Sequence, residues 1–328
     1  MNSTSSENKP GSAPLALTTA GVLDLARECG ATSVGIARAE EVAPEARERY
    51  ARFLAEGRNA EMHWMERNRD VRDDPRLLLD GAESLIVCLF NYHTDTPQAP
   101  GAPYVARYAL FRDYHKVLRK QLRPLCAALE ASGHATRVCV DSAPLRERYW
   151  ACRSGAAILG LNNQLIVPGH GSAFVVATVI TTARLTPTPP LSEASATGLV
   201  ACGRCGLCVR ACPTGALRPD GSLDARRCLS YLTIEAPADE PVPSGLSRVH
   251  AFGCDVCRLA CPHSRHDTPT SIPDFTPRRE ILDLTAAEWE ALTPGQYDRI
   301  FSGTPIRRAS LERLKANLKS PDKITRNK

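Results

Sequence analysis

Eight of the 13 cysteines lie between Cys202 and Cys261, in two runs whose spacing suits iron–sulfur ligation. The first run reads Cys202-Gly-Arg-Cys205-Gly-Leu-Cys208-Val-Arg-Ala-Cys212-Pro213. This is the C-x2-C-x2-C-x3-C-P pattern of bacterial ferredoxins, in which the fourth cysteine ligates the other of two clusters. Thiolates are soft ligands that suit iron–sulfur clusters, so the run predicts electron-transfer chemistry.

The second run supplies three more ligands and requires a fourth from elsewhere. It reads Cys254-Asp-Val-Cys257-Arg-Leu-Ala-Cys261-Pro262, which matches the last three positions of the same pattern. The first position falls at Ala251, which cannot ligate, and Cys228 is the unassigned cysteine between the runs. We therefore expect two [4Fe-4S] clusters, one held by Cys202, Cys205, Cys208 and Cys261 and the other by Cys212, Cys228, Cys254 and Cys257.

Zinc is the alternative for such a cluster of cysteines. Zinc sites use two C-x2-C pairs with a longer spacer and need neither a run of three cysteines nor a repeated Cys-Pro ending. The N-terminus has no basic and apolar export signal and no twin-arginine pair, which predicts a cytoplasmic protein in which disulfides are disfavoured. The remaining cysteines occur singly and are expected to be small buried hydrophobes.

Composition and charge place the chain among globular proteins. Of its 328 residues 43% are hydrophobic and 23% are charged, which excludes collagen, coiled coil and wholesale disorder. No apolar stretch approaches the ~18 residues that span a bilayer, so no membrane contact is expected. The net charge is +5, yet residues 299–328 alone carry nine basic and two acidic residues, which indicates contact with a polyanion.

The remaining chain must position the cysteines. Strands alternate with helices up to residue 183, which predicts an α/β or α+β domain. Within it we expect one helix from Thr18 or Thr19, a long helix at 113–132 and another helix that begins at Pro144. We expect residues 1–14 to be disordered, 15–183 to form the first domain, 184–198 to be a linker, 199–268 to hold the clusters and 269–328 to be a helical segment with a basic tail.

Specific segments resemble the epoxyqueuosine reductases, which are cobalamin-dependent iron–sulfur enzymes of tRNA queuosine biosynthesis. The most specific match is Leu223-Asp-Ala-Arg-Arg-Cys228-Leu-Ser-Tyr-Leu-Thr-Ile-Glu235, which contains the cysteine that the ligand count requires. Further matches are 61–68, 72–75, 140–148 and 301–308, and the similarity extends from about Val22 to Leu318. The resemblance implies an α+β fold, in which a nitroreductase-like, reductive-dehalogenase-like cobalamin-binding domain precedes a ferredoxin-like domain.

The resemblance also implies a reaction and a set of residues. Members reduce the epoxide of epoxyqueuosine at the tRNA wobble position, and Asp141 matches the general acid. Acid catalysis near neutral pH requires a pKa raised above the usual ~3.9, and the alternative is that Asp141 caps the helix at Pro144. His115 is not expected to ligate cobalt. The residues expected to line cobalamin are Arg72, Ala106, Asp141, Arg148, Ser230, Cys254 and Asp255.

Partners follow from the same resemblance. A tRNA anticodon stem-loop would bind through Arg307, Arg308, Arg313 and Lys315, and a separate low-potential donor would supply electrons to a monomeric enzyme. Because Ser230 and Asp255 neighbour cysteines of the second cluster, that cluster is expected to lie nearest the cobalamin. The chain departs from the family at Phe111 and at Leu161, and the region that contains Leu161 is expected near the corrin. A reductive dehalogenase, a reductase for another substrate and a ferredoxin-type electron carrier are the alternatives.

Overall fold

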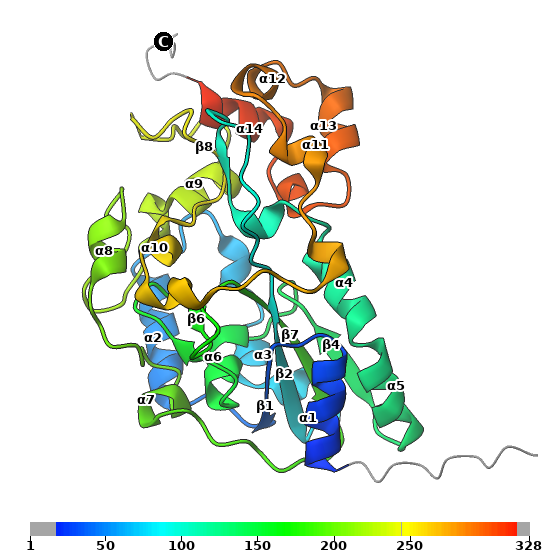
Figure 1. The fold of residues 1–328 in the computed structure, drawn as a ribbon. Helices are drawn as coiled ribbons and strands as arrows, with labels where there is room; N and C mark the ends of the chain where they lie inside the picture. The colour runs from blue at the N-terminus through cyan, green and yellow to red at the C-terminus, as the bar shows by residue number, and fades with distance from the viewer. Residues whose placement is uncertain (1–17, 244, 320–328) are drawn as a thin grey trace, which may run out of the picture.

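The computed structural model describes residues 18–243 and 245–319, so the predicted disorder at 1–14 lies outside the described residues. A four-stranded sheet with the order β1-β2-β7-β4 forms the base of the molecule, and all its neighbouring strands are antiparallel. The strands are β1 (Ser33–Arg38), β2 (Ser84–Asn91), β7 (Phe174–Thr181) and β4 (Thr136–Cys139). Figure 1 shows this sheet below the cysteine-rich and C-terminal segments.

Helices cover both faces of the sheet, which explains why β2 is apolar at nearly every position. Ile86, Cys88 and Phe90 share one core with α1 (Thr19–Glu28), α4 (Tyr114–Gln121) and α5 (Arg123–Ala131). The alternate residues Leu85, Val87 and Leu89 share a second core with α2 (Pro44–Ala55) and α6 (Glu147–Arg153). Side chains of a strand alternate between faces, so a strand covered on both faces needs a continuous apolar run.

Two expected helices differ from the structure. The helix expected at 113–132 is two helices separated at Leu122, because Pro124 has no N–H to continue the hydrogen-bond ladder. The helix expected from Pro144 begins at Glu147 instead. The segment 184–198 contains α7 (Glu193–Ala196), and the N–H of Ile36 donates to Thr188 Oγ1 over 2.8 Å, so it lies along the free edge of β1.

The cysteine-rich segment carries short helices around a parallel pair of strands. β8 (His250–Phe252) pairs with β3 (Tyr104–Val105), which precedes α4 in the chain. The helices here are α8 (Leu207–Ala211), α9 (Leu229–Ile234) and α10 (Val256–Leu259), and α8 packs against α10. Residues near 105 and residues near 252 therefore meet, although the chain separates them widely.

The C-terminal helices form a third core with this strand pair. The helices are α11 (Arg279–Leu282), α12 (Ala286–Glu290), α13 (Pro294–Phe301) and α14 (Leu311–Leu318). Val105, Phe252, Trp289 and Leu314 share the core, and α14 packs on β8 and α9. In Figure 1 these helices lie at the end of the molecule opposite the sheet.

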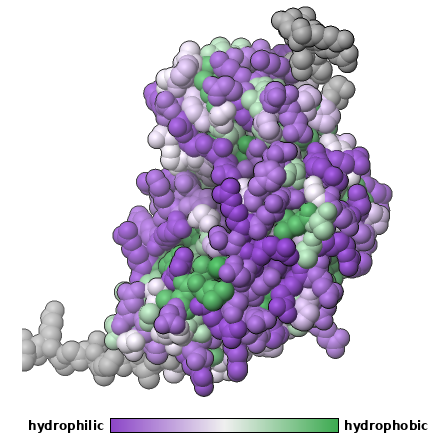
Figure 2. Space-filling model, turned by 180° about the vertical axis from the view of Figure 1, so that it is seen from behind, coloured by the Kyte–Doolittle hydropathy of each residue, from purple (hydrophilic) through white to green (hydrophobic). Residues whose placement is uncertain are grey.

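The remaining elements are short. The helix α3 (Arg69–Asp73) and the hairpin of β5 (Ile158–Leu159) and β6 (Leu165–Ile166) complete the regular elements. Seven 3-10 turns connect these elements, at His63–Met65, Pro75–Leu78, Arg107–Ala109, Ala225–Arg227, Pro262–His266, Pro273–Phe275 and Pro305–Arg308. No helix within 18–243 or 245–319 is long and apolar enough to cross a bilayer. Seen from behind, the surface is mostly hydrophilic, with a continuous hydrophobic area at the height of the sheet (Figure 2).

Candidate functional site

Four cysteines from both runs line one cavity of about 140 Å³: Cys202, Cys205, Cys208 and Cys261. Cys205 is exposed and Cys208 is buried. Burial raises the pKa of Cys208 and of Cys261, and the charges of the other thiolates in this quartet raise it further. A cationic iron centre removes this repulsion, so the donor set fits an iron–sulfur cluster. We call these residues the first quartet.

The second quartet consists of Cys212, Cys228, Cys254 and Cys257. Burial raises the pKa of Cys254 to about 11 and that of Cys257 to about 12, and the charges of Cys228 and Cys212 contribute to both shifts. The pKa of Cys212 is lowered instead, because backbone N–H groups donate to its sulfur and outweigh burial. The cysteine charges that raise the pKa values of Cys208, Cys261, Cys254 and Cys257 come from the same quartet in each case, which supports the predicted crossing of ligands between the two runs.

The quartets are more open than a single-ion site. Within 18–243 and 245–319, no three His, Cys, Asp or Glu side chains converge closely enough to hold one metal ion.

Asp141 lies where the sheet opens. Strand pairing between β4 and β7 ends at Cys139↔Thr178, so within the described chain residues 174–177 of β7 have a strand partner on one side only. Asp141 follows with a left-handed φ of +54°, and its N–H donates to Glu147 Oε1 over 2.7 Å. Because the helix α6 begins at Glu147 and the Asp141 side chain does not cap it, the capping interpretation is wrong.

The carboxylate of Asp141 is held by an aromatic hydroxyl and an imidazole. Tyr114 Oη donates to Asp141 Oδ2 over 2.8 Å, and His115 Nε2 lies 3.3 Å from the same oxygen. Desolvation raises the pKa of Asp141, but the hydrogen bonds from His115 and Tyr114 and the charge of His115 outweigh it and leave that pKa below its ordinary value. The raised pKa expected of Asp141 beneath a corrin ring stays a prediction.

The pKa of His115 is raised. Its Nδ1 atom lies 2.7 Å from Asp113 Oδ1, so both ring nitrogens contact carboxylates. Burial lowers the pKa of His115, but these two hydrogen bonds outweigh burial and raise it to about 9. Burial, with the charge of Asp141, raises the pKa of Glu147 to about 8. Sequence reasoning missed Glu147, although it lies inside the matched segment 140–148.

Three of the predicted cobalamin residues meet beside β8. The N–H of Ala106 donates to Phe252 O over 2.8 Å. A Cβ at Gly253 would lie 2.6 Å from the Cβ of Ala106, so glycine is required for this approach before Cys254. Asp255 Oδ2 accepts hydrogen bonds from Arg107 N at 2.9 Å and from Tyr104 Oη at 2.7 Å.

Further interactions connect this group to the other predicted residues. Burial raises the pKa of Tyr108, and the charges of both Asp255 and Asp141 add to the shift. Ser230 lies on α9, whose neighbouring Tyr231 Oη accepts a hydrogen bond from Glu61 N over 3.3 Å. The segment that begins at Glu61 continues to Trp64, whose carbonyl oxygen accepts a hydrogen bond from Arg72.

Arg72 and Arg148 have guanidinium groups available to a ligand. Arg72 donates to the carbonyl of Trp64 over 3.3 Å, and the adjacent Asp73 pairs with Arg146, two residues before Arg148. Among the described residues neither Arg72 nor Arg148 forms an ion pair with a carboxylate. Guanidinium groups in this state bind phosphate and amide oxygens, which fits the rim of a corrin nucleotide.

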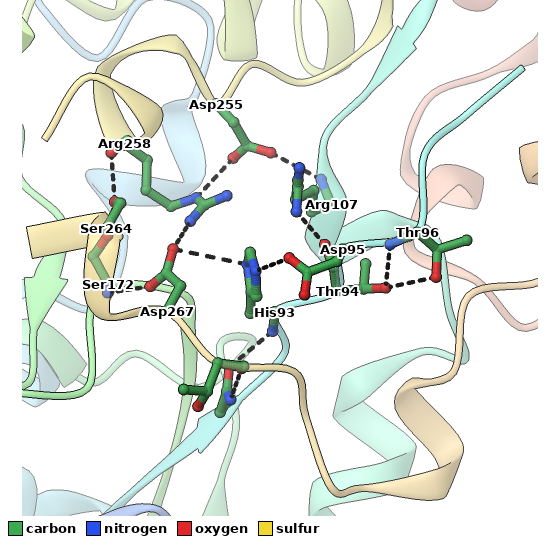
Figure 3. Close-up of polar contacts among 12 residues, drawn as sticks. His93, Thr94, Asp95, Thr96, Arg107, Ser172, Asp255, Arg258, Ser264 and Asp267 are labelled. Atoms are coloured by element: carbon green, nitrogen blue, oxygen red, sulfur yellow. Dashed lines mark hydrogen bonds and ion pairs between the residues drawn. The ribbon is translucent and has the colours of Figure 1, made fainter. Parts of the chain in front are cut away.

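Two buried carboxylates join the cysteine-rich segment to the sheet domain (Figure 3). Arg258, 2% exposed, lies between them, with its Nη1 donating to Asp267 Oδ2 over 2.6 Å and its Nε 3.6 Å from Asp255 Oδ1. Asp267 Oδ1 in turn accepts from Ser172 N over 2.8 Å. Because breaking a buried charge network leaves unpaired charges, this network holds the second quartet firmly against the sheet domain.

Comparisons with known proteins agree with this geometry. Residues 72–142 match the family model described as "Epoxyqueuosine reductase QueG, DUF1730", and 201–264 match a "4Fe-4S double cluster binding domain". The epoxyqueuosine reductase of Cellulophaga algicola is 35% identical over 88% of this chain and 93% of its own length. That of Gloeobacter violaceus is 36% identical over 93% of this chain and 96% of its own length.

The chain belongs to the epoxyqueuosine reductase family. A crystal structure of an epoxyqueuosine reductase with an epoxyqueuosine-modified tRNA stem loop superposes with a TM-score of 0.79 and 25% identity, covering 91% of this chain and 79% of that one. The predicted α+β fold, the two-cluster domain and the family resemblance are thereby confirmed. The individual ligand and contact residues stay predictions.

The predicted RNA-binding residues of this epoxyqueuosine reductase divide into two kinds. Arg308 donates to both oxygens of Glu235 over 2.7 and 2.6 Å, and Arg307 pairs with Asp298 on the surface. Arg313 is 2% exposed and donates to Asn317 Oδ1 and to the carbonyl of Glu240, so its predicted contact with RNA is wrong. Lys315 is half-buried on α14.

The two departures from the family have structural explanations. Phe111 is fully buried and packs against Phe275 in a tilted arrangement with 4.4 Å between ring centroids, so it fills the core of the sheet domain. Leu161, which is expected near the corrin, contacts the first quartet. Its N–H approaches Cys202 Sγ at 3.3 Å and its side chain packs with Cys208, so Leu161 covers the first quartet with apolar surface.

Proposed function

We propose that this chain reduces epoxyqueuosine to queuosine at the wobble position of tRNA. The observation that carries the proposal is the Asp141–His115–Tyr114 arrangement at the opening of the sheet, in a chain of this family. A ferredoxin-type electron carrier needs only the quartets and has no use for a proton held at such a site. The reductase is therefore favoured over the carrier.

The residues present fit the cofactors that the reaction requires. The two quartets suit two [4Fe-4S] clusters, and the unpaired guanidinium groups of Arg72 and Arg148, with the backbone at Ala106 and Cys254, suit a cobalamin beside Asp141. When bound, the clusters supply single electrons and the cobalamin supplies a low-valent centre for bond formation at carbon. The second quartet, adjacent to Ser230 and Asp255, is the proposed immediate electron donor.

The chain itself supplies protons. Opening an epoxide at carbon leaves an alkoxide, which is a strong base, so a proton delivered in the transition state lowers the barrier. We assign the contact with this oxygen to Asp141 and the storage of the proton to His115, whose pKa is raised to about 9. Asp113 and Tyr114 orient the two groups. Two electrons and two protons convert the epoxide to an alkene and water.

The tRNA partner is proposed to bind on the side of Asp141. Arg308 forms hydrogen bonds with Glu235 that raise its pKa, and the charge of Asp141 adds to this shift. Arg308 therefore lies near the catalytic carboxylate. Arg307, Arg308 and Lys315 would contact phosphates of an anticodon stem-loop whose wobble base is turned out of the stack. A monomeric state, a cytoplasmic location and a separate low-potential electron donor stay predictions.

The test is conversion of the modified nucleoside. Protein with anaerobically reconstituted clusters and added cobalamin is incubated with a chemical reductant and tRNA that carries epoxyqueuosine. We expect queuosine to appear in digests of the tRNA, with omission of cobalamin as the control. Full cobalamin occupancy with unchanged epoxyqueuosine would show that the chain acts on another substrate.

A further inference from the structure

The first quartet reaches the protein surface beside a second cavity. Cys205 is exposed, and the cavity that the first quartet lines adjoins a second of about 220 Å³, which shares Cys261 and Pro262 with it. Two leucines beside this second cavity are unusually open to solvent, Leu207 at 40% and Leu259 at 48%. An apolar depression therefore adjoins the cluster that lies farther from Asp141 in the predicted ligand scheme.

The exposed charges beside the first quartet are arginines, whereas Asp267 lines the second cavity and His93, which also lines it, contacts the exposed Asp95. Arg204, Arg210 and Arg265 are exposed, and Arg210 Nη1 donates to the carbonyl of Cys205 over 3.3 Å. Residues 199–219 and 256–266 contain no Asp or Glu. Asp255 and Asp267, which flank the second range, are engaged with Arg258 inside the protein, and Asp220, which follows the first range, is exposed. The surface around the first quartet is thus cationic.

The backbone supports the outward position of one of these arginines. Arg204 has a φ of +50°, a conformation that costs a residue other than glycine roughly 1 kcal/mol. Strain of this kind persists at sites of function more often than elsewhere. Here it presents a cationic side chain between two cysteines of the first quartet.

We propose that this surface, defined by Cys205, Leu207, Arg210, Leu259 and Arg265, receives a small acidic electron-carrier protein. The inference rests on the proposed function and names the partner that drives it. In each encounter the carrier is oxidised by one electron and the cluster of the first quartet is reduced by one. Two encounters supply the two electrons that one epoxide consumes.

An acidic protein fits this surface better than RNA does. An apolar centre with a charged rim is the usual anatomy of a protein–protein contact, and redox encounters bury the smallest areas, below about 1,200 Å². RNA backbones offer phosphates but nothing for Leu207 and Leu259 to bury. Complementary charge steers such short-lived encounters and makes their rate depend on salt.

The test follows cluster reduction directly. Cluster-loaded protein is mixed in a stopped-flow instrument with reduced flavodoxin, an acidic one-electron carrier, and the cluster absorbance is recorded at about 50 mM and about 500 mM salt. We compare the native chain with the double variant Arg210→Glu and Arg265→Glu. The control is the double variant Arg184→Glu and Arg279→Glu, which changes the charge equally at two exposed positions outside this surface.

We expect reduction of the Arg210→Glu, Arg265→Glu variant to be about tenfold slower at low salt, and the difference to shrink at high salt. The control should match the native chain, and dithionite should reduce all three equally. Iron content verifies the clusters. If the double variant loses iron, the single variant Arg265→Glu takes its place, because Arg265 lies beyond the last cysteine. Its reduction should be slowed less than that of the double variant.

Equal reduction rates for the native chain and the Arg210→Glu, Arg265→Glu variant at low salt would overturn the proposal. So would a variant that binds tRNA more weakly but is reduced by flavodoxin at the native rate. Failure of the proposed function has a different signature. In that case flavodoxin reduces the clusters with the stated charge dependence, while epoxyqueuosine is not consumed even with dithionite.

Discussion

The Nε2 atom of His115 lies 3.3 Å from the Oδ2 atom of Asp141. Asp113 holds the other side of the same ring, at 2.7 Å from Nδ1. An imidazole between two carboxylates keeps its proton to a higher pH than a free one, and its pKa rises to about 9 although burial opposes the shift. The site therefore stores one proton beside the residue assigned to the substrate oxygen.

The pH dependence of the reaction reports this pair. The pKa of His115 is raised above its ordinary value. The imidazole therefore holds its proton at lower pH and loses it as the pH rises through about 9. We expect the native rate to fall above this pH and, in His115→Gln, to begin falling at least one unit lower. Single-turnover rates from pH 6 to 10 with a titanium(III) reductant measure the shift, and His170→Gln, at an exposed histidine, is the control. An unmoved basic limb would exclude His115 as the proton store.

Replacing Asp141 with Asn tests proton delivery without changing the shape of the side chain. We expect the turnover rate to fall by about 10²–10⁴-fold, the usual contribution of a general acid, while cluster content and tRNA affinity are unchanged. Asp113→Asn, which removes only the second contact of His115, should cost much less. Near-native turnover by Asp141→Asn would assign the acid to another group.

Cys228 is the ligand that the spacing rule places out of order. Cys228→Ala should reduce the iron content from about eight to about four atoms per chain, because only the second quartet loses a thiolate. Cys126→Ala, at a half-buried cysteine outside both quartets, should retain all the iron. Full iron content in the Cys228 variant would show that another residue completes the second cluster.

Arg308 and Arg313 lie close in sequence and are expected to fail in different ways. Arg308→Ala breaks an exposed pair with Glu235, so the unfolding free energy should change by less than about 1 kcal/mol while the salt dependence of tRNA binding weakens. Arg313→Met leaves the carbonyls of Pro237 and Glu240 without a donor and should lower the unfolding free energy by roughly 2–4 kcal/mol. Urea unfolding and filter binding separate the two. Weaker tRNA binding with native stability in Arg313→Met would restore its predicted contact.

Local patterns predicted the elements well where one residue decides the outcome. Thr18 caps α1 through its side chain, as the sequence indicates, and the apolar run 84–91 is β2, one of the two inner strands of the sheet. The error at 113–132 came from following the apolar face and giving Pro124 too little weight. Arg313 was misassigned because charge alone does not reveal that α14 turns this side chain into the protein.

The order of the cysteines along the chain was enough to predict two four-iron clusters. Thiolate spacing decides which sulfurs can surround one cluster, and Cys228 lies between the two runs. What only the tertiary structure decided is the state of the acid. The pKa values of Asp141 and His115 depend on the distance between their side chains, which β4 and α4 bring together across some 25 residues of chain. Electrostatic energy depends on separation in space and on exposure to water, and neither is written in local sequence.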